Sequence, residues 1–259
     1  MESQKELQNL VERSWTESAP GYDAIVEAEL QSAKKDAWKT LILANTPKRQ
    51  SDRLKILDIG TGPGFFPVIL ASEDVEVSGI DCTEEMARMA EKNVSKHGKK
   101  ANIRVMDSHS LDFSDGSFDV VLSRNVSWTL SDPEKAYAEW ARVVRPGGRV
   151  LIFDANWQRH YHDEEARKFF DEHDKDFFAQ YGEHIEGFMN HFRDPEQART
   201  LRRSTPMGTH QRPQWDFDVL LKLGFRRFHF DTRVGEVVWT PEEQFKNRYA
   251  PMFMISAER

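Results

Sequence analysis

The chain has 259 residues and a formal net charge of −7. This length suits one sizeable α/β domain with an insertion better than two independent domains. Nucleic-acid binding by counterion release needs clustered lysines and arginines, so the acidic balance argues against a nucleic-acid partner.

The chain carries one cysteine, Cys82, so no intrachain disulfide can form and nothing indicates an oxidising compartment. The charged first ten residues lack the apolar run of a signal peptide, and no stretch approaches the roughly 18 apolar residues of a membrane-spanning helix. We therefore expect a cytoplasmic protein without a membrane partner, present as a monomer or a homodimer.

Residues 1–50 show apolar spacings of three and four that predict helices, with an interruption at Ser18-Ala19-Pro20-Gly21. Residues 51–156 change to short apolar runs separated by amphipathic stretches, the pattern of βαβ units around a parallel sheet. The expected strands lie near 54–59, 75–80, 102–106, 118–123 and 149–154. The expected helices between them lie near 64–72, 83–96 and 133–144.

Residues 157–213 break this alternation and are expected to form a helical insertion that acts as a lid over the sheet. Within it, six aromatic side chains are predicted on one helical face: Phe169, Phe170, His173, Phe177, Phe178 and Tyr181. Residues 214–259 return to the sheet, with a helix near 215–223, a strand near 225–232, a capping box at 240–243 and a last strand near 252–257. All four segments are expected to belong to a single domain.

The strongest functional pattern is the run Ile56-Leu57-Asp58-Ile59-Gly60-Thr61-Gly62-Pro63-Gly64, a strand that leads through a glycine-rich turn into a helix. Glycines let the backbone approach a ligand closely, and a helix N-terminus favours polar or negative ligand groups. The second strand then ends in an acid, Asp81, where a carboxylate can accept both ribose hydroxyls of an adenosine.

This segment resembles motif I of the class I S-adenosylmethionine-dependent methyltransferases, and in particular their ubiquinone-biosynthesis-type branch. Further runs resemble the family's later motifs in the same order: Val105-Met106-Asp107-Ser108, Phe118 to Val126, and Arg142 to Gly148. The resemblance covers residues 50–155. It implies a three-layer, Rossmann-like α/β fold with a mostly parallel seven-stranded sheet whose last strand is antiparallel.

The resemblance also implies S-adenosylmethionine as cofactor, S-adenosylhomocysteine as product and a small-molecule methyl acceptor. Residues around the methionine part would be Asp58, Gly60, Thr61 and Gly62, with Tyr22 folded over its carboxylate. Asp81 would bind the ribose. The adenine would be contacted by Cys82, Met86, Asp107 and Ser108, and Asn125 would lie where the sulfonium and the acceptor meet. For Tyr22 and Met86, simple packing between helices is an equal alternative.

No metal site is predicted, and methyl transfer from a sulfonium depends on alignment and desolvation more than on a dedicated catalytic group. Where the acceptor must lose a proton, His160 and His162 are the candidate bases, because they follow the fifth strand at the edge expected to face the site. Satisfied or solvated histidines are the alternative.

Two other functions fit parts of the pattern. A nicotinamide-dependent oxidoreductase shares the glycine-rich turn and the later acid, but its Gly-x-Gly-x-x-Gly pattern would need glycine where Phe65 stands. A regulatory protein that binds the cofactor without transferring its methyl group would have the same cofactor motifs.

Overall fold

The computed structural model describes residues 2–47, 53–185 and 194–259, which include seven strands in one sheet ordered β3-β2-β1-β4-β5-β7-β6. The strands are β1 Leu54–Ile59, β2 Val75–Asp81, β3 Asn102–Val105, β4 Phe118–Arg124, β5 Val144–Asp154, β6 Arg227–Asp231 and β7 Phe253–Glu258. The predicted boundary at residues 50 and 51 lies outside the described residues.

The first five strands run parallel, and β7 runs antiparallel to both β5 and β6, as predicted. Because β1 lies between β2 and β4, the strand order reverses there, and the carboxyl ends of β1 and β4 border the crevice where open α/β sheets bind ligands. β5 starts at Val144, earlier than predicted, with a register irregularity between Phe118 and Val120.

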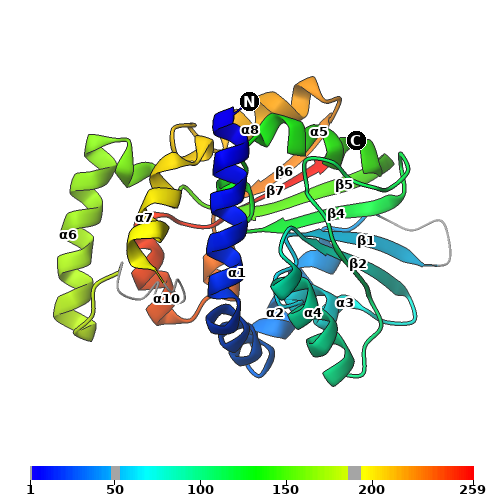
Figure 1. Ribbon diagram of the computed structural model, residues 1–259, viewed down its shortest axis with the longest axis horizontal. Helices are drawn as coiled ribbons and strands as arrows, with labels where there is room; N and C mark the ends of the chain where they lie inside the picture. Colours follow the sequence, from blue (N-terminus) through cyan, green and yellow to red (C-terminus); the bar gives the residue numbers. More distant parts are fainter. Residues whose placement is uncertain (1, 48–52, 186–193) are drawn as a thin grey trace.

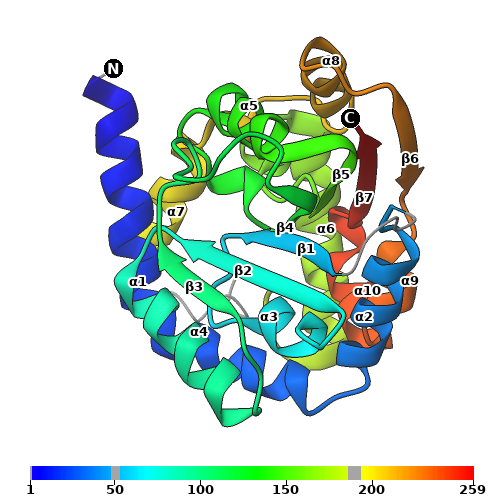
Figure 2. The ribbon, with the colours of Figure 1, turned by 90° about the vertical axis from the view of Figure 1, so that its right-hand side faces the viewer.

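Helices cover both faces of the sheet, so the molecule has three layers (Figures 1 and 2). α2, α3, α4 and α9 cover one face, and α5 and α8 cover the other. Their bounds are α2 Lys34–Ala44, α3 Phe65–Leu70, α4 Glu84–Lys96, α5 Pro133–Val143, α8 Gln214–Lys222 and α9 Val234–Val238. No helix in the described part of the chain is both long enough and apolar enough to cross a membrane.

The two faces of the sheet are filled by alternating residues of the same strands. In β1, Ile56 packs with the α2 and α3 side, whereas Leu57 and Ile59 pack with the α5 and α8 side. Side chains that point alternately to both buried faces give the nearly continuous apolar runs from which the parallel strands are predictable. The predicted caps are confirmed as well, since Thr83 accepts from Met86 N and Asp132 from Lys135 N.

The predicted interruption at residues 18–21 is wrong, because α1 runs unbroken over Glu2–Leu30 with Pro20 inside it. A proline inside a helix removes one backbone hydrogen bond, which costs about 3 kcal/mol. The buried Ala19 packs against Met86 and Met89 of α4, and the Ser18 hydroxyl donates to Ser14 O at 2.6 Å. Tertiary packing therefore keeps this segment helical against its local preference.

The insertion is helical as predicted, with α6 at Glu164–Tyr181 and α7 at Pro195–Ser204, while residues 186–193 lie outside the described part. The predicted single aromatic face of α6 is wrong. Phe170, His173 and Phe177 are buried, but Phe169 and Phe178 are 43 % and 46 % exposed, and Tyr181 is exposed as well. α6 projects at one end of the molecule (Figure 1). Only the narrow stripe formed by Phe170, His173 and Phe177, at positions i, i+3 and i+7, therefore packs against the rest of the protein.

The carboxyl end of β5 is tied to α8 by a buried charge cluster. The Arg212 guanidinium donates to Asp154 Oδ2 at 2.9 Å and to Asp216 Oδ1 at 2.7 Å, and all three side chains are at most 1 % exposed. The Tyr137 hydroxyl of α5 donates to Asp216 at 2.7 Å and lies 3.2 Å from the Ser127 hydroxyl. The cluster thereby connects four segments on one side of the crevice.

Replacing Arg212 tests this cluster. We expect Arg212→Met to lower the free energy of unfolding by about 3–5 kcal/mol, because it leaves two buried carboxylates without their cation. The matched control is Arg227→Met, whose arginine pairs with Glu258 at 2.9 Å but is 81 % exposed, and which should change stability by less than about 1 kcal/mol. Equal, small losses in urea unfolding of both variants would contradict this account.

Candidate functional site

A cavity lies at the carboxyl ends of β1, β2 and β4 and under α1. The lining residues come from α1 and from the segments that follow the strands: Gln8, Val11, Trp15, Tyr22, Gly60, Gly62, Ile80, Asp81, Cys82, Met86, Met106, Asp107, Ser108, His109, Arg124, Asn125, Val126, Thr129 and Leu130. Nine of the predicted site residues are among them. The structure therefore brings together residues that are more than 100 positions apart in the sequence.

The floor of the cavity is the turn after β1. Gly60 has φ +63°, and a Cβ there would lie 2.5 Å from a methyl group of Val126, the residue that follows Asn125 after β4. Gly62 has φ +52° and lies against the ring of Tyr22. A side chain at Gly60 would therefore strain the backbone and push the β1 and β4 ends apart, so glycine is required for this close approach.

Asp81 closes this turn from the neighbouring strand. Its Oδ2 accepts from Gly62 N at 3.0 Å, and its Oδ1 accepts from Thr83 N and Thr83 Oγ1, each at 3.0 Å. Burial raises the pKa of Asp81, and the hydrogen bonds from Thr83 and Gly62 oppose that rise. The carboxylate is thus fixed at the cavity wall, and Oδ2, which accepts one hydrogen bond here, keeps a lone pair for a ligand hydroxyl.

Asp107 also lines the cavity, together with His109, which the sequence analysis did not indicate. His109 donates from N and from Nδ1 to Asp107 Oδ1, at 2.9 and 2.6 Å, and His109 Nε2 accepts from Asp132 N at 3.2 Å. Burial opposes ionisation of Asp107, but the His109 hydrogen bonds outweigh it and lower its pKa. Oδ2 of an ionised Asp107 is therefore available to accept a donor from a ligand.

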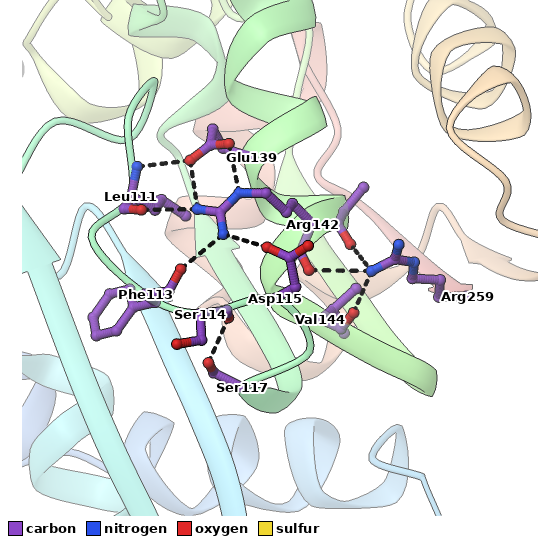
Figure 3. A network of polar contacts seen from close by, with 10 residues as sticks. Leu111, Phe113, Ser114, Asp115, Ser117, Glu139, Arg142, Val144 and Arg259 are labelled. Carbon is purple, nitrogen blue, oxygen red and sulfur yellow. Dashed lines mark hydrogen bonds and ion pairs between the residues drawn. The ribbon is translucent and has the colours of Figure 1, made fainter.

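The loop that carries Asp107 is held by Arg142 of α5 (Figure 3). The Arg142 guanidinium donates to Glu139, to the carbonyls of Leu111 and Phe113 at 2.8 and 2.7 Å, and to Asp115. Leu111 N donates to Glu139 in turn. Because Arg142 satisfies backbone groups of this irregular segment, the loop has a defined position beside the cavity.

Asn125 begins the segment after β4 with φ +57°, a left-handed conformation that asparagine tolerates better than most residues. Its backbone N–H donates to Phe153 O at 2.9 Å, whereas its side-chain Oδ1 is buried without a hydrogen-bond partner. A buried acceptor without a partner is costly unless a ligand or water supplies one. Asn125 is therefore suited to accept an N–H or O–H from a bound molecule.

Asp58 and Thr61 are buried beneath the turn and do not line the cavity, in contrast to the prediction that they surround the ligand. The Thr61 hydroxyl donates to Asp58 Oδ2 at 2.7 Å, and Thr61 N donates to Ile80 O. Burial raises the pKa of Asp58 to about 7, against the opposing effects of the Thr61 hydrogen bond and the charge of Arg124. These two residues act on the site through the turn that they support.

Helix α1 covers the cavity, which the sequence pattern did not reveal. Gln8, Val11 and Trp15 line it together with the predicted Tyr22, and the Trp15 ring meets the Tyr22 ring edge-on at 5.5 Å. Residues 157–185 and 194–213 of the insertion contribute no lining residue, and α7 packs against α1 from outside. The covering element is thus α1, with the insertion behind it.

The predicted Cys82 and Met86 line the cavity next to Asp81. Burial raises the pKa of the Cys82 thiol well above its usual range, so the group stays protonated and serves as an apolar wall. Arg124 is a further lining residue that the sequence analysis passed over, although it lies inside a recognised motif. A buried arginine is identified by its tertiary surroundings and not by any sequence spacing.

The two candidate bases lie outside the cavity lining. His160 is buried beneath α6, stacked on the Phe170 ring at 4.1 Å, and both of its ring nitrogens lack a partner. His162 packs against Gly208. Both border a separate surface depression with Asp163 and Arg203. The geometry therefore gives no support to either histidine as a base for chemistry in the cavity.

Residues 57–152 match the protein family described as "Methyltransferase domain". Over 100 residues the chain is 37 % identical to the phosphatidylethanolamine N-methyltransferase of Cereibacter sphaeroides, an alignment that covers 38 % of this chain and 49 % of that protein. Over 146 residues it is 31 % identical to the demethylmenaquinone methyltransferase of Thermus thermophilus, covering 54 % and 63 %. The chain thus spans less than two thirds of the length of these two relatives.

Among solved structures, a similar fold is found in a phosphoethanolamine N-methyltransferase 2 of Haemonchus contortus, in complex with phosphomonomethylethanolamine and S-adenosylhomocysteine. The superposition has a TM-score of 0.58 and covers 86 % of this chain and 52 % of that chain, at 18 % sequence identity. At this identity the likeness concerns the fold alone.

The buried His160 generates a pH prediction. Burial, assisted by the charges of Arg167 and Arg202, lowers its pKa from 6.5 to about 4. The unfolded chain takes up this proton near pH 6.5 and the folded chain only near 4, so we expect up to about 3 kcal/mol of stability to be lost as pH falls through this window. Urea unfolding across the window measures the loss.

His160→Phe should remove this part of the pH dependence, because phenylalanine keeps the ring stack on Phe170 without a titrating group. The control His97→Gln changes an exposed histidine and should retain the wild-type dependence. Parallel stability profiles for the wild type and His160→Phe would refute the assignment.

Proposed function

We propose that the chain, whose residues 57–152 match the family described as "Methyltransferase domain", is a class I S-adenosylmethionine-dependent methyltransferase that binds S-adenosylmethionine in the cavity under α1 and transfers the methyl group to a small-molecule acceptor. The observation that carries this proposal is the closure of the Gly60–Gly62 turn by Asp81. This arrangement offers a carboxylate to the ribose hydroxyls beside a backbone that a ligand can approach.

The remaining lining residues fit the rest of the nucleoside. Ile80, Met86 and Leu130 offer apolar surface for the faces of an adenine ring, and Asp107 offers a free carboxylate oxygen to its amino group. Asn125 offers its unpartnered Oδ1 to a donor on the amino-acid part or on the acceptor. The donor supplies a methyl group on a positively charged sulfur that is already a good leaving group.

This chain's own part in the reaction is alignment and exclusion of water. α1 covers the cavity with Val11 and Trp15, so a bound donor would be largely desolvated. In-line displacement is accelerated when the reacting atoms are held in contact in a water-poor site, and no dedicated catalytic residue is required. The acidic balance of the chain supports a small acceptor over a nucleic acid.

The direct test combines binding and turnover. Isothermal titration calorimetry with S-adenosylmethionine and S-adenosylhomocysteine should detect one site per chain. Incubation with S-adenosylmethionine and fractionated small metabolites should then yield a product heavier by one methyl group in mass spectrometry. Binding without any methylated product across a broad acceptor panel would favour the non-catalytic alternative, and absence of binding would refute the proposal.

Asp81→Asn tests the ribose contact. We expect the affinity for S-adenosylhomocysteine to fall about 100-fold, because hydrogen bonds to a charged group are worth about 1.5–3 kcal/mol each. Asp74→Asn, at an exposed position before the opposite end of β2, is the matched control and should bind as the wild type does. Unchanged affinity in a folded Asp81→Asn protein would rule out the ribose role.

Asp58 should make binding of the cationic donor pH-dependent. Its pKa is raised to about 7, and a nearby positive ligand favours the ionised carboxylate. Affinity for S-adenosylmethionine should therefore rise as pH increases through about 7 and level off above it, with proton release below that pH. Calorimetry in buffers of different ionisation enthalpy measures the released proton.

The matched variant for this prediction is Asp58→Asn, which retains an acceptor for the Thr61 hydroxyl but cannot ionise. Its binding should show neither the rise in affinity nor the proton release. The same slope in both proteins would assign the effect to another group.

A further inference from the structure

Arg124 is the one lysine or arginine that lines the cavity among the described residues. It ends β4, beside Asn125 and close to Tyr22, and its side chain is 10 % exposed. Burial is the largest single influence and lowers the pKa of Arg124, but the charges and hydrogen bond of its acidic surroundings, with Glu29 first among them, together outweigh burial and raise it. The cavity therefore holds a permanent positive charge at the end that Tyr22 covers.

The guanidinium is fixed before any ligand binds. Its Cζ lies over the rings of Phe65, Phe66 and Trp38, at 4.6, 5.1 and 5.2 Å from their centroids. The two terminal nitrogens donate to the carboxylate of Glu29 of α1, at 3.5 and 3.0 Å. A group whose orientation is set in advance loses little entropy on binding, which favours specific recognition.

Arg124 is not the only cation that offsets the negative charge of Glu29. Its carboxylate also lies 4.0 Å from Lys34 Nζ of α2, and Lys34 pairs with Glu243 of α10 (Pro241–Lys246). The four charges alternate in sign from the cavity to α10. A second anion that binds Arg124 would compete with Glu29. Lys34 would still offset the charge of a displaced Glu29.

We propose that Arg124 binds the carboxylate of the donor's amino-acid part, and that Glu29 is a competing placeholder that neutralises Arg124 while the cavity holds no carboxylate. This proposal rests on the proposed function. Two of the five guanidinium N–H groups donate to Glu29 in the hydrogen bonds described above, so a planar carboxylate can meet the others. Arg124 is then the residue that selects nucleosides with an amino-acid chain.

The experiment compares two nucleosides that differ at one group, S-adenosylhomocysteine and its decarboxylated analogue. Calorimetry on the full chain should show the wild type binding S-adenosylhomocysteine about 100-fold more tightly than the analogue, as expected for a charged hydrogen-bonded pair. Arg124→Met should reduce this preference to about threefold or less, with the analogue bound as in the wild type, and Arg124→Lys should retain part of it.

Glu29→Gln separates recognition of the carboxylate from structural damage. Arg124→Met should lower the preference for S-adenosylhomocysteine over its analogue, whereas Glu29→Gln should raise it. Removing the competing negative charge should raise the preference for the carboxylate by about tenfold. A preference that falls or stays unchanged in Glu29→Gln overturns the placeholder role. The control Arg145→Met, near the first residue of β5 and paired with Asp119, should leave both affinities unchanged.

The outcomes also separate this inference from the proposed function. If neither nucleoside binds the wild type, the proposed function fails. If both bind the wild type equally, or if Arg124→Met keeps the full preference, the cavity still takes an adenosine but the assignment of Arg124 is overturned.

Discussion

The hydrogen bond from Gly62 N to Asp81 Oδ2 connects the carboxyl ends of β1 and β2. It requires a turn with positive φ at Gly60 and Gly62, and it requires Val126, after β4, to lie against that turn with no Cβ between them. Three neighbouring strand ends are thus held at fixed distances by the glycine turn, the Asp81 carboxylate and the Val126 side chain. The cavity exists because this arrangement leaves the space above the turn open and because α1 covers it from the other side.

The charges around the cavity follow from the same arrangement. The negative charges of Glu29 and Asp58 act on the buried Arg124, and Asp81 lies close enough to Asp58 to raise its pKa. Each buried acid is supported by hydrogen bonds or by the arginine, yet burial still raises the pKa of Asp58 and Asp81. A ligand that carries both positive charge and a carboxylate complements this set better than a neutral molecule of the same size.

Ion pairs and aromatic contacts stabilise the parts of the protein around the cavity. Sequence patterns give little information about such contacts. Arg212 ties β5 to α8, and Arg142 holds the loop that carries Asp107 (Figure 3). His160 is buried against Phe170, away from the cavity lining, although its position after β5 predicted a place at the site. Position along the chain indicates which edge of a sheet a residue lies near, but packing decides which cavity it borders.

The sequence by itself determined where the strands lie, that most of them run parallel and that a glycine-rich turn follows β1, because strand burial and glycine turns are local patterns with fixed periods. The antiparallel last strand and most residues of the cavity wall came from the resemblance to the methyltransferases. It could not determine that α1 continues through Pro20 and covers the cavity, since packing against α4 overrides the local preference of that segment. Nor could it find Arg124 with Glu29, or His109 with Asp107 and Asp132. These groups gain their roles from partners that only the folded chain brings within hydrogen-bond distance.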